Sequence, residues 1–144
     1  MSARIAEIAR SWIGTPYIHQ ASCRNAGADC LGLIRGVWRE LYGCEPAKIP
    51  AYTCDWDEPR RGETLLCAVS EIMISLPAVA LEPGDLLLFR MRDRAMAKHM
   101  GIVTSGGACP TFVHAYSGHG VVETTLNQPW QRRVVARFGF PKGS

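Results

Sequence analysis

The spacing of apolar residues changes once along this 144-residue chain, near Pro77. Before that point, three stretches repeat apolar residues at helical intervals, at 5–13, 30–42 and 65–76. After it, short apolar runs alternate with turn residues, at 85–90, 99–104, 111–116, 121–126 and 133–140. Helices followed by an antiparallel meander predict an α+β fold, with N-terminal helices packed on an antiparallel sheet of about five strands.

The ends of the second helix are marked in the sequence. Asp29 is a favoured N-cap residue, and Gly43 stands where a left-handed C-terminal residue is expected. We therefore expect a helix from about Cys30 to Tyr42, with Cys30 in its first turn.

The first and third helices are predicted from their apolar stripes. Gly14 and Pro16 stop the first helix, and we expect its stripe in the core: Ile5, Ile8, Ala9, Trp12 and Ile13. The third helix is expected to end at Pro77. Residues 16–28 have no periodicity and predict a loop.

The composition is typical of one globular domain over residues 1–144, because 47% of the residues are hydrophobic and 20% are charged. The net charge of +3 is spread along the chain without a basic stripe, so we expect no nucleic-acid partner. No apolar stretch reaches membrane-spanning length and no signal peptide is recognisable, so we expect synthesis in the cytoplasm and no stable membrane insertion.

The six cysteines lack the spacing of a disulfide framework or a zinc site, and we expect free thiols and no metal. Cys30 differs from the others in its position at a helix start. Backbone N–H groups and the helix dipole stabilise a thiolate there, so we expect the pKa of Cys30 to be lowered.

Two histidines are predicted to meet across a hairpin. If Ser105 to Ala108 form a four-residue connection, Thr104 pairs with Cys109 and His99 lies directly opposite His114. Opposed residues lie on the same sheet face, within reach of an imidazole–imidazole hydrogen bond. A thiol, a base and a residue that orients the base form a generalised catalytic triad, here Cys30, His99 and His114.

Five segments, in this order and spacing, resemble the NlpC/P60 family, and within it the cell-wall peptidases of phage tails and gene transfer agents. They are Trp12-Ile-Gly-Thr-Pro-Tyr17, Asp29-Cys-Leu-Gly-Leu33, Pro83-Gly-Asp-Leu86, His99-Met-Gly-Ile-Val103 and Phe112-Val-His-Ala115. The resemblance implies a reduced papain-like fold, with the nucleophile helix packed on a sheet that supplies both histidines. It also implies a cysteine peptidase that needs no cofactor.

The resemblance further implies the substrate and two more site residues. The substrate would be the stem peptide of peptidoglycan, cleaved at the γ-D-glutamyl to diamino-acid bond. The Tyr17 hydroxyl would join the Cys30 backbone N–H in stabilising the oxyanion. Asp29 would contact a substrate amine, a role that can coexist with helix capping. Leu31 stands where many members have serine, which weakens any inference about recognition of a free amino terminus.

Several alternatives stay open at this level. The chain could instead be a tail structural or docking component with little activity, or an amidase or acyltransferase on the same scaffold. We expect phage-like tail proteins as partners, with the chain associated with a particle and acting in the periplasm on the cell wall. The sequence assigns no role to His19 or Cys23, and none to the proline-bearing segment 47–77.

Overall fold

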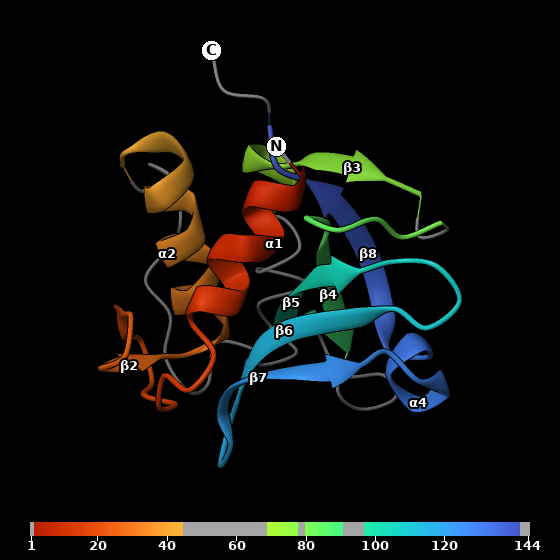
Figure 1. Cartoon of the computed structure of the whole chain (residues 1–144). Helices are drawn as coiled ribbons and strands as arrows, with labels where there is room; N and C mark the ends of the chain where they lie inside the picture. Colours follow the sequence, from red (N-terminus) through yellow and green to blue (C-terminus); the bar gives the residue numbers. More distant parts are fainter. Residues whose placement is uncertain (1, 45–68, 78–79, 91–96, 142–144) are drawn as a thin grey trace, which may run out of the picture.

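The computed structural model describes residues 2–44, 69–77, 80–90 and 97–141. Two helices, α1 (Ser2–Ser11) and α2 (Cys30–Tyr42), lie together on one side of a sheet (Figure 1). The sheet has six strands in the order β3-β8-β4-β5-β6-β7, and every neighbouring pair is antiparallel. The α+β prediction is confirmed, with six strands in place of about five.

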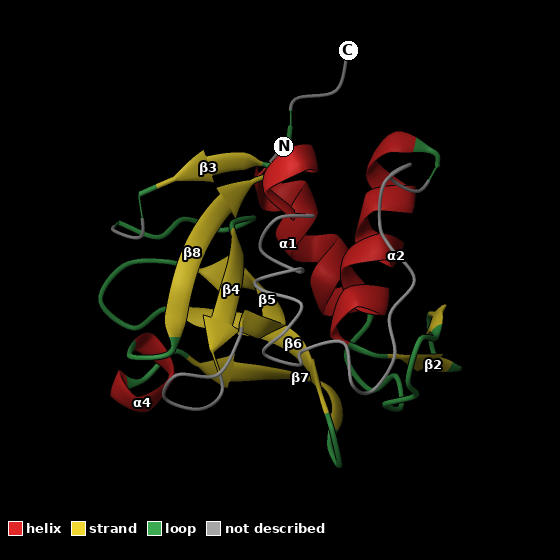
Figure 2. Cartoon of the chain, turned by 180° about the vertical axis from the view of Figure 1, so that it is seen from behind, coloured by secondary structure: helices red, strands yellow, loops and turns green. Residues whose placement is uncertain are grey.

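The strands after Pro77 lie close to the predicted ranges. They are β4 (Leu86–Arg90), β5 (Ala97–Ser105), β6 (Thr111–Tyr116), β7 (Gly120–Thr125) and β8 (Val134–Gly139). Strands β4 to β7 form a meander, and β8 then returns to pair with the free side of β4 (Figure 2). A short helix that the sequence did not predict, α4 (Gln128–Gln131), lies in this return, where Asn127 caps it and Pro129 sits in its first turn.

Helix α2 begins and ends as the sequence predicts. The Asp29 side chain accepts a hydrogen bond from the Gly32 N–H at 2.7 Å, which satisfies one of the free donors of the first turn. Gly43 adopts φ 84° and its N–H bonds the Arg39 carbonyl at 2.8 Å. These local caps fix the position of Cys30 at the helix start.

The prediction that the whole apolar stripe of the first helix lies in the core was wrong at one residue, Ile13. Helix α1 ends at Ser11, and residues 12–14 form a turn. Trp12 stays in the core with 2% exposure, but Ile13 is 42% exposed because the chain no longer follows the helical direction.

The prediction for the third helix was wrong at its C-terminal end. Residues 69–72 are helical, whereas β3 (Ile74–Leu76) pairs antiparallel with β8. Pairing with a sheet edge replaces the helical continuation that the apolar spacing indicated. The start of the predicted helix, like most of segment 47–77, lies outside the described residues.

The predicted loop 16–28 contains a small hairpin. Strand β1 (Ser22–Cys23) pairs with β2 (Gly27–Ala28), and the hairpin packs against α2. The carbonyl oxygen of Ala21 lies where a Cβ on Gly32 would meet it at 1.8 Å. Only glycine allows this approach, which holds the loop against the first turn of α2.

The sheet buries apolar residues on both faces. The cluster between the helices and the sheet includes Trp12, Leu33, Leu88, Met100, Ile102 and Val113. The cluster on the opposite face consists of Leu87, Phe89, Val103, Phe112 and Leu126, with Leu81, Trp130 and Val134 packed against it. Among the described residues, no helix is long and apolar enough to cross a membrane.

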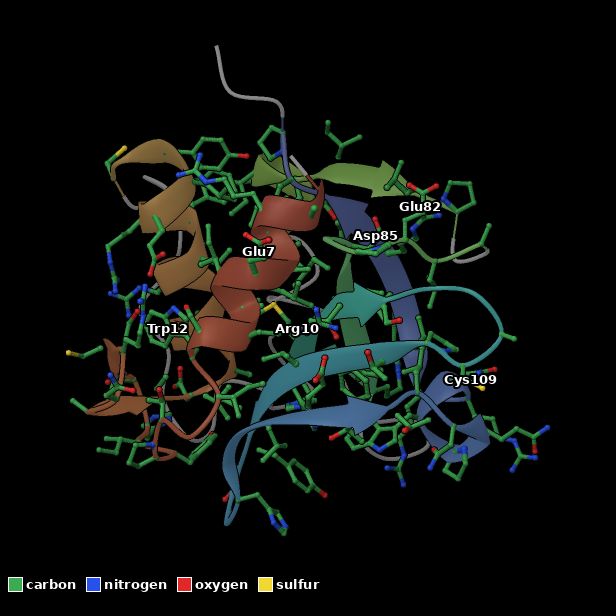
Figure 3. The ribbon with its side chains drawn as sticks, viewed as in Figure 1. Glu7, Arg10, Trp12, Glu82, Asp85 and Cys109 are labelled. Atoms are coloured by element: carbon green, nitrogen blue, oxygen red, sulfur yellow. The ribbon has the colours of Figure 1, made fainter. Side chains whose placement is uncertain are left out.

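Two ion pairs tie distant segments to the sheet. Asp85 accepts from Arg137 at 2.7 Å, and both side chains are about nine-tenths buried. Arg10 of α1 reaches Glu123 of β7 at 3.0 Å, and Figure 3 shows Arg10 on the side of α1 that faces the sheet. The buried pair joins the turn before β4 to β8, which places the start of the meander.

Candidate active site

Cys30 lies at the point where α2 meets β5. The backbone N–H groups of Met100, Leu31 and Cys30 itself are directed at its sulfur. Met100 follows His99 directly, so the fold brings the thiol to the strand position next to the predicted base. The Cys30 residue as a whole is partly exposed.

The expected protonation state of Cys30 was wrong for this structure. Burial and the neighbouring Asp29 carboxylate raise the pKa of the Cys30 thiol to about 12. The backbone N–H groups do favour the thiolate, as the helix-start argument expects, but burial and Asp29 outweigh them. At neutral pH the resting side chain is therefore a thiol.

The predicted contact between the two histidines is present, although the predicted register was wrong. His99 Nε2 lies 2.7 Å from His114 Nδ1, inside the protein. The strands pair Ile102 with Val113 and Val103 with Phe112, two residues away from the predicted register. Carried to the start of β5, this offset makes His114 a diagonal neighbour of His99, still on the same face.

The turn between the strands explains the shift. The register is irregular between Val103 and Ser105, and the connection runs over residues 106–110. Gly107 adopts φ 81°, and the buried Pro110 has no N–H to give to the ladder. A longer turn with a bulge therefore replaces the four-residue connection.

Both histidines are neutral in the folded protein. Burial, followed by the neighbouring His114, lowers the pKa of His99 to about 3. Burial, followed by His119, lowers the pKa of His114 to about 4. A neutral imidazole can accept a proton at one nitrogen while it donates from the other, as a general base requires.

Thr124 extends this pair and was missed in the sequence. Its Oγ1 lies 2.8 Å from His114 Nε2, so both nitrogens of His114 have partners. Thr124 lies on β7, where it pairs with Phe112, and it reaches His114 diagonally. Only the β6–β7 register reveals the contact, since the sequence alone offers several hydroxyl residues nearby.

Aromatic rings surround the histidines. The Trp130 ring lies 5.9 Å from His99, 5.1 Å from His114 and 5.8 Å from Tyr116, measured between centroids. Phe112 lies 4.3 Å from His114 on the same face. Trp130 packs at the edge of the second cluster, where it covers the histidine pair.

Both carboxylate oxygens of Asp29 accept backbone hydrogen bonds at the start of α2. Oδ1 accepts from Gly32 N–H, and Oδ2 accepts from Gln20 N–H at 2.6 Å. The carboxylate is buried, with 2% exposure, and His19 Nδ1 lies 3.7 Å from Oδ2. The capping role is confirmed, while contact with a substrate amine stays a prediction.

Tyr17 lies beside the nucleophile helix. It forms a parallel bridge with Ala28, and Ala28 N–H bonds the Pro16 carbonyl at 2.9 Å. The ring is half-buried against the helix-side core. Tyr17 thus lies next to the segment that leads into Cys30, and its role toward the oxyanion stays a prediction.

Four cysteines fall in the described ranges, and none of them forms a disulfide there: Cys23, Cys30, Cys44 and Cys109. Cys54 and Cys67 lie outside those ranges. Cys109 is exposed in the β5–β6 connection, on the side of the molecule away from α2 (Figure 3). In the part of the chain that the structure describes, no group of three or more His, Cys, Asp or Glu side chains could hold a metal ion.

The chain matches a family model and curated proteins in sequence. The model of the NlpC/P60 family matches residues 14–138. Murein DD-endopeptidase MepS/Murein LD-carboxypeptidase of Escherichia coli strain K12 is 28% identical over 134 residues, which cover 92% of this chain and 60% of that protein. The protein of the same name from Escherichia coli O157:H7 matches equally well. The chain thus spans about 60% of the length of the curated relatives it matches.

Solved structures share the fold. The NlpC/P60 domain of peptidoglycan hydrolase SagA superposes with a TM-score of 0.62 at 23% identity, covering 97% of this chain and 99% of that one. An NlpC/P60 family protein from Bacillus cereus ATCC 10987 gives 0.68 at 17% identity, covering 95% of this chain and 39% of that one. These superpositions confirm the expected fold.

Proposed function

Because the chain belongs to the NlpC/P60 family, we propose that it is a cysteine peptidase that cleaves peptide bonds in peptidoglycan. The observation that carries the proposal is the His99–His114 hydrogen bond of 2.7 Å beside the strand position that the Cys30 sulfur reaches. Cys30 would be the nucleophile, His99 the general base and His114 the residue that orients His99.

The hydrogen bonds assign an atom to each step. His114 occupies Nε2 of His99, so Nδ1 is the nitrogen that would take the thiol proton. As the sulfur attacks the carbonyl carbon, its proton moves to Nδ1 and a tetrahedral oxyanion forms. The imidazolium then gives this proton to the leaving amine as the C–N bond breaks, which leaves a thioester on Cys30. Water hydrolyses the thioester with His99 again acting as base, and the thiol is restored.

The resting protonation states of Cys30 and His99 determine when the proton is transferred. A pKa of about 12 for Cys30 and about 3 for His99 makes the neutral pair the resting state. Proton transfer would therefore accompany attack on the carbonyl, in place of a preformed thiolate–imidazolium pair. The backbone N–H of Cys30 and the Tyr17 hydroxyl would stabilise the developing oxyanion.

The bond that is cleaved belongs to the same proposal. The sequence resemblance favours the γ-D-glutamyl to diamino-acid bond, whereas the name of the Escherichia coli relative specifies DD-endopeptidase and LD-carboxypeptidase activities. Purified sacculi incubated with the protein should release muropeptides, and mass spectrometry of the new ends identifies the bond.

Cys30→Ala is the matched control for this experiment, since it removes only the sulfur. Loss of release in Cys30→Ala supports the peptidase, whereas equal release by both proteins contradicts it.

A tail component without activity would release nothing. An amidase that cleaves the sugar–peptide link would free peptides that lack muramic acid. An acyltransferase would modify an added amine instead of releasing new ends.

Delivery by a phage-like tail, with action on the wall in the periplasm, is a further part of the proposal. It is supported by the resemblance of the five sequence segments to tail and gene-transfer-agent peptidases. Immunodetection in purified particles and in cell fractions tests it. A particle-bound fraction is expected, and a protein found only free in the periplasm would contradict this route.

A further inference from the structure

A chain of two hydrogen bonds runs inward from the base. His99 Nε2 lies 2.7 Å from His114 Nδ1, and His114 Nε2 lies 2.8 Å from Thr124 Oγ1. His114 is only 1% exposed. Because a neutral imidazole carries one proton on two nitrogens, the partners on both sides of His114 decide which nitrogen holds it.

Only one arrangement of protons leaves His99 able to act as a base. For Nδ1 of His99 to accept the thiol proton, the proton of His99 must sit on Nε2 and be donated to His114 Nδ1. His114 must then carry its own proton on Nε2, and that N–H needs an acceptor. Thr124 Oγ1 is in place to accept it.

Resting on the proposed function, we infer that Thr124 is a positioning residue that fixes the tautomer of His114 and, through it, the tautomer of His99. The Thr124 hydroxyl contacts His114, and we infer that it acts through that ring. Its hydroxyl is half-buried on the edge strand β7, so it can donate its own proton outward while it accepts from His114.

A histidine needs this help more than an amide would. The carbonyl and amino ends of asparagine are fixed, so asparagine at position 114 can present an acceptor without further support. A histidine without Thr124 can place its proton on Nδ1 instead, and it then donates to His99. That arrangement puts the proton of His99 on Nδ1, facing the thiol, where the ring can no longer accept.

Aromatic rings enclose the His114 imidazole. Trp130, Phe112 and Tyr116 lie with ring centroids 5.1, 4.3 and 5.4 Å from His114. A buried donor that loses its partner costs about 1–3 kcal/mol, which corresponds to a rate effect of roughly 5- to 150-fold if borne by the active tautomer.

Thr124→Val tests the inference, because valine keeps the shape of threonine and removes only the hydroxyl. We expect kcat for muropeptide release to fall roughly tenfold with KM nearly unchanged, and Thr124→Ser to restore most of the loss. Thr125→Val, on the same strand but exposed, is the matched control and should leave kcat unchanged.

The same substitution in a His114→Asn background separates tautomer control from packing. Asparagine has no tautomer to fix, so Thr124→Val should cost less than about twofold there. An equal loss of kcat in both backgrounds would show that Thr124 only supports the local structure, and would overturn the inference.

A readout without activity keeps the inference distinct from the proposed function. Imidazole ¹⁵N NMR reports which nitrogen of His114 carries the proton. The expected result is a proton on Nε2 in the unmodified protein and a mixed or reversed population in Thr124→Val. The same Nε2 tautomer in both proteins refutes the inference, whatever the enzyme does to sacculi. Conversely, the expected shift in a protein that releases no muropeptides would contradict only the proposed function.

Discussion

The two faces of the sheet bury different kinds of side chain. The face toward α1 and α2 is covered by aliphatic side chains with Trp12 and Phe138 among them. The opposite face carries an aromatic cluster in which the buried His99 and His114 are held by Phe112 and Trp130. One face thus holds the helices in place, and the other holds the imidazoles.

The difference shows how a small fold keeps polar groups inside. Burying an imidazole is tolerable when it is neutral and each nitrogen has a partner, which is the arrangement on the His99–His114 face. The helix face needs no such pairing and contributes the thiol only at its edge, where α2 begins. The thiol and the imidazoles of the proposed chemistry therefore come from different sides of the sheet.

The largest expected effect is the loss of activity in His99→Ala. Removal of a general base costs roughly 10²–10⁴ in rate, and the variant should still fold because the helix-side core is untouched. Muropeptide release gives kcat, and circular dichroism checks the fold. If kcat of a folded His99→Ala variant fell less than tenfold, His99 would not be the general base, and the proposed role of the histidine face would be contradicted.

The second prediction concerns stability alone. Leu33 on α2 is fully buried, and Leu33→Ala should lower the free energy of unfolding by about 2–5 kcal/mol. Ile13→Ala is the matched control, because Ile13 is 42% exposed, and its effect should stay within about 0.5 kcal/mol. Urea unfolding measures both. Similar costs at the two positions would mean that Ile13 is buried after all.

The third prediction concerns the pH dependence of stability. Burial lowers the pKa of His99 to about 3 and of His114 to about 4, from 6.5. Below pH 6.5 the histidines of the unfolded chain bind protons, whereas those of the folded chain stay neutral. The free energy of unfolding is therefore highest above pH 6.5 and falls as the pH drops toward 4. The carboxylates of the chain also make the free energy of unfolding depend on pH. A variant without the two histidines is therefore needed to isolate their contribution.

The double variant His99→Gln/His114→Asn provides that comparison. It removes both titrating rings, so its melting temperature should decline less than that of the unmodified protein between pH 6.5 and 4.5. Thermal unfolding at half-unit pH steps measures the difference. Parallel declines would mean that the histidines are already able to protonate in the folded state.

The sequence determined the features whose signals are local. Asp29 and Gly43 mark the ends of α2 by capping, and both ends were predicted to the residue. The alternation of strand residues determined which face each side chain occupies. For this reason a register error of two residues still placed His99 and His114 on one face, because the strand period is two.

Only the tertiary structure decided what depends on distant partners. Residues 74–76 follow a helical apolar spacing, yet they form β3 because β8 offers an edge with which to pair. The thiol of Cys30 is protonated because burial and Asp29 outweigh the helix start, a balance that depends on what packs around the sulfur. Thr124 meets His114 through the register of β6 and β7, which no local pattern encodes. Capping and alternation act within a few residues, whereas desolvation and strand pairing are set by segments that only folding brings together.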